Sequence, residues 1–386
     1  MNLDELYKAR YVLNGIIRRT DLVQAPRLNP DADIYLKPEN LQVTGSFKVR
    51  GACYKISQLS DEEKARGVIA CSAGNHAQGV ALGATHAGVK SLICLPEGAP
   101  ISKVEATRRY GAEICLVPGV YDDAYQHALK LRDEHGYTFV HPFDDEKVIA
   151  GQGTIGLELL EQLPDVRCVI VPIGGGGLAS GVAYAIKSLN PSVEVWGVQA
   201  AGAPSMYHSV ADGIAVKQPG ELTYDLCHKH LDGIVTVTED EICAAILAII
   251  EQQKMVVEGA GAVAVAAAMF NKVPIAGKKT ICILSGGNVD VTILNRVIHR
   301  GLVKSGRICK LTLTLEDKPG QLVGVSQIIS SMGGNVVKVN HERSDDSNRV
   351  TDCILQLQVE TRNHEHVDSI RKALIEAGFN TQCQVY

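Results

Sequence analysis

One lysine and three glycine-rich segments are the residues of this chain best suited to chemistry. Lys48 ends the segment Gly45-Ser46-Phe47-Lys48, and a lysine amine can form an imine with an aldehyde. The glycine-rich segments lie at 72–76, 174–177 and 285–288, each where a strand-like apolar run ends. Main-chain N–H groups in such loops bind anions, above all before a helix. The pattern predicts a small-molecule site for a cofactor that carries both a phosphate and an aldehyde.

The glycine run at 174–177 is the predicted phosphate loop. It lies between an apolar strand and a helix, and four successive glycines allow several N–H groups to point toward one anion. The run contains neither a G-x-G-x-x-G fingerprint nor the lysine of a Walker motif, which argues against a dinucleotide or a nucleoside triphosphate. A tight turn that binds nothing is the alternative, although four glycines cost conformational entropy that one would avoid.

The other two loops offer hydrogen-bond donors. The segment Ser72-Ala73-Gly74-Asn75-His76 could hold a carboxylate, and Asn75 could donate to an oxygen of a ligand ring. A simple helix N-cap explains this segment equally well. The hydroxyl of Ser285 could donate to a pyridine nitrogen, or it could be an ordinary turn serine. Lys48 by itself could be a solvated surface charge, although a cation is slightly unfavourable at a helix start.

Strand and helix patterns alternate along most of the chain, which predicts parallel βαβ units and an α/β fold. The expected strands are 34–37, 68–71, 91–95, 113–117, 166–172, 193–199 and 280–284, and the expected helices are 3–14, 47–59, 76–88, 101–110, 122–135, 178–189, 239–253 and 260–270. After about residue 304 the order becomes β-α-β-β-α-β, the ferredoxin-like arrangement. We therefore predict a domain 1–304, with a smaller sub-unit at about 45–140, and a domain 308–386.

The composition narrows the class of protein. Hydrophobic residues at 46% and charged residues at 21% are typical of a globular chain, and a net charge of −5 argues against nucleic acid or an anionic membrane as partner. The 11 cysteines lie singly, without a C-x-x-C pair or histidines at zinc-ligand spacing, so we expect buried thiols and no metal site. Neither a signal peptide nor a membrane-spanning run is seen, so the cytoplasm is the expected location.

Taken together and in this order, the Ser46-Phe47-Lys48 segment and the three glycine-rich loops resemble those of the fold-type II pyridoxal-phosphate enzymes, and within them the threonine dehydratases. The resemblance covers about residues 20–303, and the tail from about residue 308 resembles an ACT domain, a regulatory module that often binds amino acids. It implies two open parallel-sheet α/β units of the tryptophan-synthase-β type followed by a ferredoxin-like ACT domain. It also implies dehydration and deamination of L-threonine to 2-oxobutanoate and ammonia, with L-serine as a second substrate.

The resemblance assigns roles to individual residues. Lys48 would hold pyridoxal phosphate and act as general base, and a neutral serine at the ring nitrogen would favour loss of the β-hydroxyl. The implied cofactor-binding residues are Phe47, Lys48, Asn75, Gly174, Gly175, Gly176, Gly177, Leu178 and Ser285, and the implied carboxylate-binding residues are Ser72, Asn75 and His76.

Three positions differ from the residues that related enzymes carry, and the role of Glu258 and the function of the tail have alternatives. Ala73 stands where serine racemases carry a second serine, which favours dehydration over racemisation, and Gln199 and Ser205 replace acidic metal ligands. Glu258 could line the site or cap a helix. The alternatives are a serine dehydratase or other hydroxy-amino-acid eliminase, and, in another class, an amino-acid sensor without catalysis. The tail could bind an amino-acid effector or serve only in oligomerisation, and its edge strands make a homo-oligomer the expectation.

Overall fold

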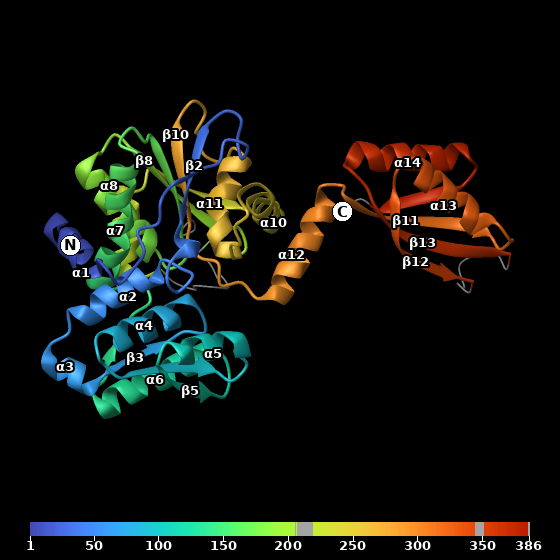
Figure 1. Ribbon diagram of the computed structural model, residues 1–386. Helices are drawn as coiled ribbons and strands as arrows, with labels where there is room; N and C mark the ends of the chain where they lie inside the picture. The colour runs from blue at the N-terminus through green and yellow to red at the C-terminus, as the bar shows by residue number, and fades with distance from the viewer. Residues whose placement is uncertain (205, 207–218, 344–350, 385–386) are drawn as a thin grey trace. The chain divides into compact units, whose positions relative to one another are not determined.

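A computed structural model describes residues 1–204, 206, 219–343 and 351–384 (Figure 1). The chain forms two compact units, Met1–Val291 and Thr292–Tyr386, and each is considered by itself. The division falls at the start of helix α12 (Val291–Lys304), which the sequence patterns left unassigned. No helix among the described residues is long and apolar enough to cross a membrane.

A mainly parallel sheet forms the centre of the first unit, with strand order β1-β2-β10-β7-β8-β9 and only β1 antiparallel to its neighbour. Parallel strands are normally covered on both faces. Here α7 and α8 cover one face, and α11, with α10 beside it, covers the other (Figure 1). The bounds are β1 Val23–Gln24, β2 Asp33–Pro38, β7 Cys168–Pro172, β8 Glu194–Ala200, β9 Gly233–Val237, β10 Lys279–Leu284, α1 Leu3–Leu13, α7 Glu146–Gln162, α8 Gly177–Leu189, α9 Glu221–His230, α10 Glu239–Ala248 and α11 Gly259–Met269.

A smaller parallel sheet in the same unit has the order β5-β4-β3-β6. Alternate side chains of β3 enter different cores: Val68 and Ala70 pack with α2 and α4, whereas Ile69 and Cys71 pack with α6. The predicted α/β class is therefore confirmed in both sheets. The bounds are α2 Lys48–Ser57, α3 Asp61–Arg66, β3 Val68–Cys71, α4 Asn75–His86, β4 Ser91–Pro96, α5 Ile101–Arg109, β5 Glu113–Val117, α6 Tyr121–His135 and β6 Thr138–Phe139.

The second unit contains an antiparallel sheet in the order β12-β13-β11-β14. Its chain order is β-α-β-β-α-β, and alternate residues of β11 and β13 form its core with two helices. This is the ferredoxin-like arrangement. The bounds are β11 Ile308–Glu316, α13 Gln321–Ser331, β12 Asn335–Glu342, β13 Asp352–Glu360, α14 His364–Glu376 and β14 Asn380–Gln384.

Two helices differ from the sequence patterns. The predicted helix at 239–253 ends as α10 at Ala248 and continues as a π-helical turn, Ile249–Gln253, which stops at the left-handed residue Lys254. Helix α7 was missed because it is buried over most of its length and carries several glycines, which the sequence patterns treat as loop residues. A Cβ at Gly151 would lie 2.6 Å from the carbonyl oxygen of Arg50, so glycine allows α7 to approach α2 closely.

A buried ionic network begins two residues after Lys48, at Arg50 on the same helix. Arg50 is fully buried and donates to both oxygens of Glu39, at 2.8 Å each, and to Glu158 at 2.7 Å. Lys37, also fully buried, donates to Glu158 at 2.5 Å. Burial alone would raise the pKa of Glu39, but the charge and hydrogen bonds of Arg50 hold it below the ordinary value. The network joins β2, the short turn after it, α2 and α7.

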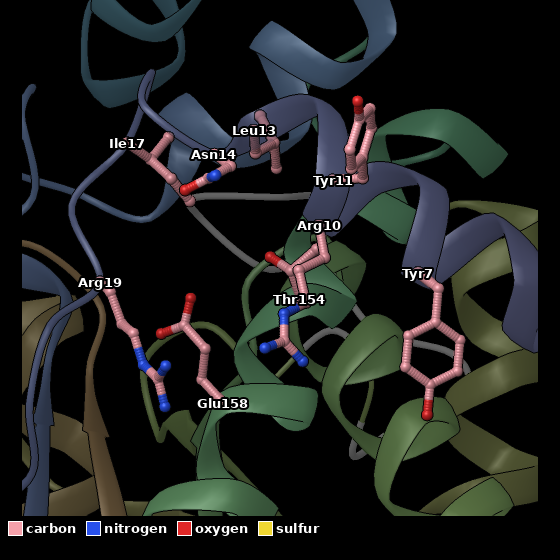
Figure 2. Close-up of a pocket in the computed structure, with 9 residues that line it drawn as sticks. All are labelled: Tyr7, Arg10, Tyr11, Leu13, Asn14, Ile17, Arg19, Thr154 and Glu158. Atoms are coloured by element: carbon pink, nitrogen blue, oxygen red, sulfur yellow. The ribbon is translucent and has the colours of Figure 1, made fainter.

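The two carboxylates of this network differ in their surroundings. A cavity of about 400 Å³ opens between α1 and α7, and Glu158 lies on its wall together with Arg10 and Arg19 (Figure 2). Glu39 is fully buried, and its carboxylate accepts hydrogen bonds from Arg50, Gln42 and the hydroxyl of Thr20. Removal of Arg50 would therefore leave the buried carboxylate of Glu39 without its directly paired cation.

We expect Arg50→Ala to lower the free energy of unfolding by about 3–5 kcal/mol, because breaking a buried ion pair strands its partner. Arg108→Ala, which removes an exposed partner of Glu105 on α5, should change stability little. Chemical denaturation of the two variants beside the wild type measures the difference. Equal, small losses in both variants would contradict the importance of this network.

Candidate active site

Backbone hydrogen bonds fasten the segment before Lys48 to the loop after β10. The N–H of Phe47 donates to the carbonyl of Ser285 at 3.1 Å, and the N–H of Gly287 donates to the carbonyl of Gly45 at 2.9 Å. An isolated β-bridge between the same two segments completes the contact. The two segments follow the carboxyl ends of the neighbouring parallel strands β2 and β10, where ligands of α/β sheets bind. Lys48 and Ser285 are thereby held at one edge of the sheet.

The Lys48 amine is half-buried and has a neutral hydrogen-bond partner. Its Nζ donates to the carbonyl oxygen of Pro142 at 2.5 Å and lies 5.3 Å from the centre of the Phe47 ring. Burial lowers the pKa of Lys48 from 10.5 to about 8, and the negative charge of Glu258 opposes this shift. A larger fraction of the amine is therefore neutral near neutral pH, the state in which a lysine acts as nucleophile or base.

The asparagine loop lies against both of these segments. Asn75 donates to Glu258 Oε1 at 2.6 Å and accepts a hydrogen bond from Asn288 at 2.7 Å. Asn288 also donates to the carbonyl of Thr44 at 2.8 Å, close to Lys48. Helix α4 begins at Asn75, and its N-cap, Gly74, provides no side-chain cap. The first-turn N–H groups are thus without intrahelical partners and suited to an anion.

The remaining two predicted carboxylate-binding residues are placed differently. The hydroxyl of Ser72 accepts from the N–H of Gly74 at 3.2 Å and stays within the loop. His76 is buried, and its Nε2 lies 2.8 Å from the carbonyl oxygen of Val140. Burial lowers the pKa of His76 to about 3, so the ring is neutral. The imidazole is held by Val140 at Nε2, and its Nδ1 is buried without a hydrogen-bond partner among the described residues.

The glycine loop at 174–177 forms a cup before helix α8. Gly176 has φ of 93°, a conformation that favours glycine, and it is an N-cap without a side chain. A Cβ at Gly175 would lie 2.3 Å from the Phe143 ring, whereas a Cβ at Gly174 would meet no atom within 4 Å. Phe143 therefore closes one side of the loop, and the side of Gly174 stays open. The next residue, Leu178, is buried and anchors the helix.

Two features of the site were missed or left open by the sequence. The segment Pro142-Phe143 joins Lys48 to the glycine loop and carries no motif, although it follows the short strand β6. Glu258 occupies the N-cap of α11, but its side chain makes no capping bond, so the capping alternative is wrong. Burial raises the pKa of Glu258 despite the hydrogen bond from Asn75.

Two positions stand where relatives carry acidic metal ligands. Gln199 is buried, and its side-chain oxygen accepts a hydrogen bond from the N–H of Met206, whereas Ser205 lies outside the described residues.

The residues present fit pyridoxal phosphate. Lys48 offers an amine with a lowered pKa, and the glycine cup offers main-chain donors for a phosphate. The Ser285 hydroxyl is buried and lies 3.2 Å from the carbonyl of Ala260, at the edge where Lys48 lies. The hydroxyls of Thr44 and Ser46 are buried around Lys48 without a hydrogen-bond partner among the described residues, as expected where a polar ligand completes a site.

Comparison with known proteins agrees with this geometry. Residues 13–287 match the family described as "Pyridoxal-phosphate dependent enzyme". L-threonine ammonia-lyase of Thermotoga maritima is 47% identical over 99% of both chains. Among solved structures, threonine deaminase isoform 2 of Solanum lycopersicum has a TM-score of 0.71 at 36% identity, over 78% of this chain and 89% of that one. Maize serine racemase has a TM-score of 0.73 at 32% identity, over 78% and 98%. The chain belongs to the pyridoxal-phosphate dependent enzymes.

The lowered pKa of Lys48 predicts the pH dependence of cofactor uptake. The rate at which cofactor-free protein takes up pyridoxal phosphate should rise through about pH 8, because only the neutral amine attacks the aldehyde. Glu258→Gln should move this midpoint lower, since the Glu258 charge raises the pKa of Lys48. Stopped-flow absorbance measures the rate, with the exposed Glu239→Gln on α10 as control. A midpoint near 10, or one that Glu258→Gln leaves unchanged, would contradict the assignment.

Proposed function

We propose that this protein catalyses the dehydration and deamination of L-threonine to 2-oxobutanoate and ammonia, with L-serine as a second substrate. The observation that carries the proposal is Lys48: a half-buried amine with a lowered pKa and no carboxylate partner in the described part of the chain. Similarity to L-threonine ammonia-lyase of Thermotoga maritima extends over 99% of this chain and supports the choice of substrate.

The proposed reaction assigns a task to each loop. The residues of the glycine cup, Gly174, Gly175, Gly176 and Gly177 with Leu178, would hold the cofactor phosphate, and Phe47, Asn75 and Ser285 would surround its ring. When bound, pyridoxal phosphate withdraws electrons from the α-carbon of the amino acid. Ser72, Asn75 and the N–H of His76 would orient the substrate carboxylate at the start of α4. Lys48 takes the α-proton as general base, and the β-hydroxyl leaves with a proton as water. The released enamine then takes up water and forms 2-oxobutanoate and ammonia.

The choice between dehydration and racemisation depends on the second face of the α-carbon. Racemisation needs a proton donor on the face opposite Lys48, and Ala73, which lies between Ser72 and Gly74, has no titratable group. Without a hydroxyl at position 73, a proton taken by Lys48 is expected to return to the face from which it came. This favours elimination, although maize serine racemase has a similar fold.

Lys48→Ala should reduce 2-oxobutanoate release from L-threonine by at least about 10²–10⁴-fold, the usual contribution of a general base. The variant should also lose covalent attachment of the cofactor, seen as loss of the borohydride-sensitive visible absorbance. Lys130→Ala on the exposed face of α6 should retain activity. A protein with bound cofactor that releases pyruvate from L-serine but nothing from L-threonine would favour the serine dehydratase. Absence of the visible absorbance in the wild type would favour an amino-acid sensor.

Ala73→Ser should introduce racemisation, because a hydroxyl at this position can carry a proton on the face opposite Lys48. We expect formation of D-serine from L-serine to rise by about tenfold or more over the wild type. Chiral chromatography of the reaction mixture measures it, with Ala73→Gly as the matched control that opens space without adding a hydroxyl. D-serine from Ala73→Gly at the level of Ala73→Ser would mean that space, not a proton donor, limits racemisation.

The second unit has the ferredoxin-like order of an ACT domain, and an amino-acid effector is proposed for it, near Lys318-Pro319-Gly320 and Asn335-Val336-Val337. Its edge strand β12 exposes Val337 and Val339, which supports self-association into a homo-oligomer. The cysteines with described side chains are free thiols, which supports a reducing compartment such as the cytoplasm.

A further inference from the structure

Three different metal-ligating side chains meet at one end of the sheet in the second unit. Within the part of the chain that the structure describes, Asp317, His341 and Cys353 bring a carboxylate oxygen, a ring nitrogen and a sulfur within 4.8 Å of one another. They come from three separate segments: Asp317 follows β11, His341 lies near the end of β12, and Cys353 lies at the start of β13. None of these residues belongs to the pyridoxal-phosphate site.

The sheet register fixes this meeting point. Cys353 on β13 lies opposite Leu315 on β11, and His341 on β12 lies opposite Leu355 on β13. Because residues two apart on a strand share a face, His341 lies diagonally across from Cys353 on the same face. The N–H of Asp317 donates to the carbonyl of Thr351 at 2.8 Å, which holds this turn beside the start of β13.

The cluster combines one fixed ligand with two adjustable ones. The thiol of Cys353 is buried in the core of the unit, whereas Asp317 and His341 are exposed and can rotate. With metal–ligand bonds of 2.0–2.3 Å, the ligand atoms of a tetrahedral zinc site lie about 3.3–3.8 Å apart. Closing from 4.8 Å requires movement of about 1 Å, which two exposed side chains can supply. The open side of the cluster gives an ion access.

We propose that Asp317, His341 and Cys353 form a binding site for a Zn²⁺-like transition metal ion. A mixed sulfur, nitrogen and oxygen set suits Zn²⁺ and Co²⁺ and is unsuited to Mg²⁺ or Ca²⁺, which take oxygen ligands. Three protein ligands leave a fourth position for water or a small ligand. The site does not depend on the proposed threonine activity, and its ligands fall outside the local spacing patterns by which zinc sites are found in sequences.

Arg343 competes with a metal ion for Asp317. Its Nε lies 3.3 Å from Asp317 Oδ2, so in the absence of metal the carboxylate already attracts an exposed cation. A metal ion must compete with this guanidinium for the same oxygen. Removal of Arg343 should therefore tighten metal binding, whereas removal of any ligand should weaken it. A role of these residues in folding alone predicts no such opposite signs.

Titration of chelator-treated full-length protein with Zn²⁺, followed by isothermal calorimetry, tests the site. The wild type should bind one zinc ion per chain that Mg²⁺ does not displace. His341→Ala and Asp317→Asn, both at exposed positions, should weaken binding by more than about 100-fold, since loss of outer partners alone costs about 10–100-fold. Arg343→Gln should tighten it by up to about fivefold, because exposed ion pairs are weak.

Matched controls separate this cluster from other metal-binding groups on the chain. His299→Ala on α12 and Asp368→Asn on α14 remove exposed residues of the same types and should leave zinc binding unchanged. Wild-type protein that binds no zinc would overturn the proposal. Zinc affinity that His341→Ala and Asp317→Asn leave at the wild-type value would overturn it as well, because the ion would then be bound elsewhere.

Discussion

The active site depends on the backbone contact between the segment that precedes Lys48 and the loop that follows β10. These loops are far apart in the sequence, but β2 and β10 are neighbours in the sheet, with Pro38 opposite Leu284. Hydrogen bonds between main-chain groups then fix the two loops, and the Asn288 side chain adds a bond to the carbonyl of Thr44. Lys48 and Ser285 are consequently positioned by the sheet itself, and Asn75 is added through Glu258 and Asn288.

The surroundings of the buried cations explain why Lys48, and not its neighbours, is suited to chemistry. Arg50 and Lys37 each have a carboxylate within hydrogen-bond distance, and their charges are used to join β2, α2 and α7. Among the described residues, Lys48 donates to a carbonyl, that of Pro142, and Glu258 acts on Lys48 through its charge. A cation without a direct counter-ion is destabilised by burial, so its neutral form becomes accessible. The ion pairs of Arg50 and Lys37 join the elements around Lys48, and Lys48 itself, with no carboxylate hydrogen-bonded to it in the described part of the chain, stays reactive.

Local patterns predicted much of this arrangement, and non-local contacts account for what they missed. The βαβ repeat, the glycine cup and the residues Lys48, Asn75 and Ser285 could be found because each lies in a short segment with its own periodicity or composition. For Glu258 the sequence left a place in the site and a helix cap open, and it gave no signal for the Pro142-Phe143 segment, since both roles arise only when distant strands meet. His76 shows how packing adds to what the sequence indicates: the sequence predicts an anion site at the helix start, and packing directs Nε2 of the ring to Val140.

In the second unit, too, local patterns predict the strands, whereas contacts between distant segments do not follow from them. Its alternating strands could be predicted because period-two burial is a local property of β11 and β13. The meeting of Asp317, His341 and Cys353 is a property of the register between three strands, and a shift by one residue would turn His341 to the other face. In both units the groups able to do chemistry come from segments that only the sheet brings together. Function in this chain is therefore set by strand order and register, and the short motifs supply side chains to positions that the sheets define.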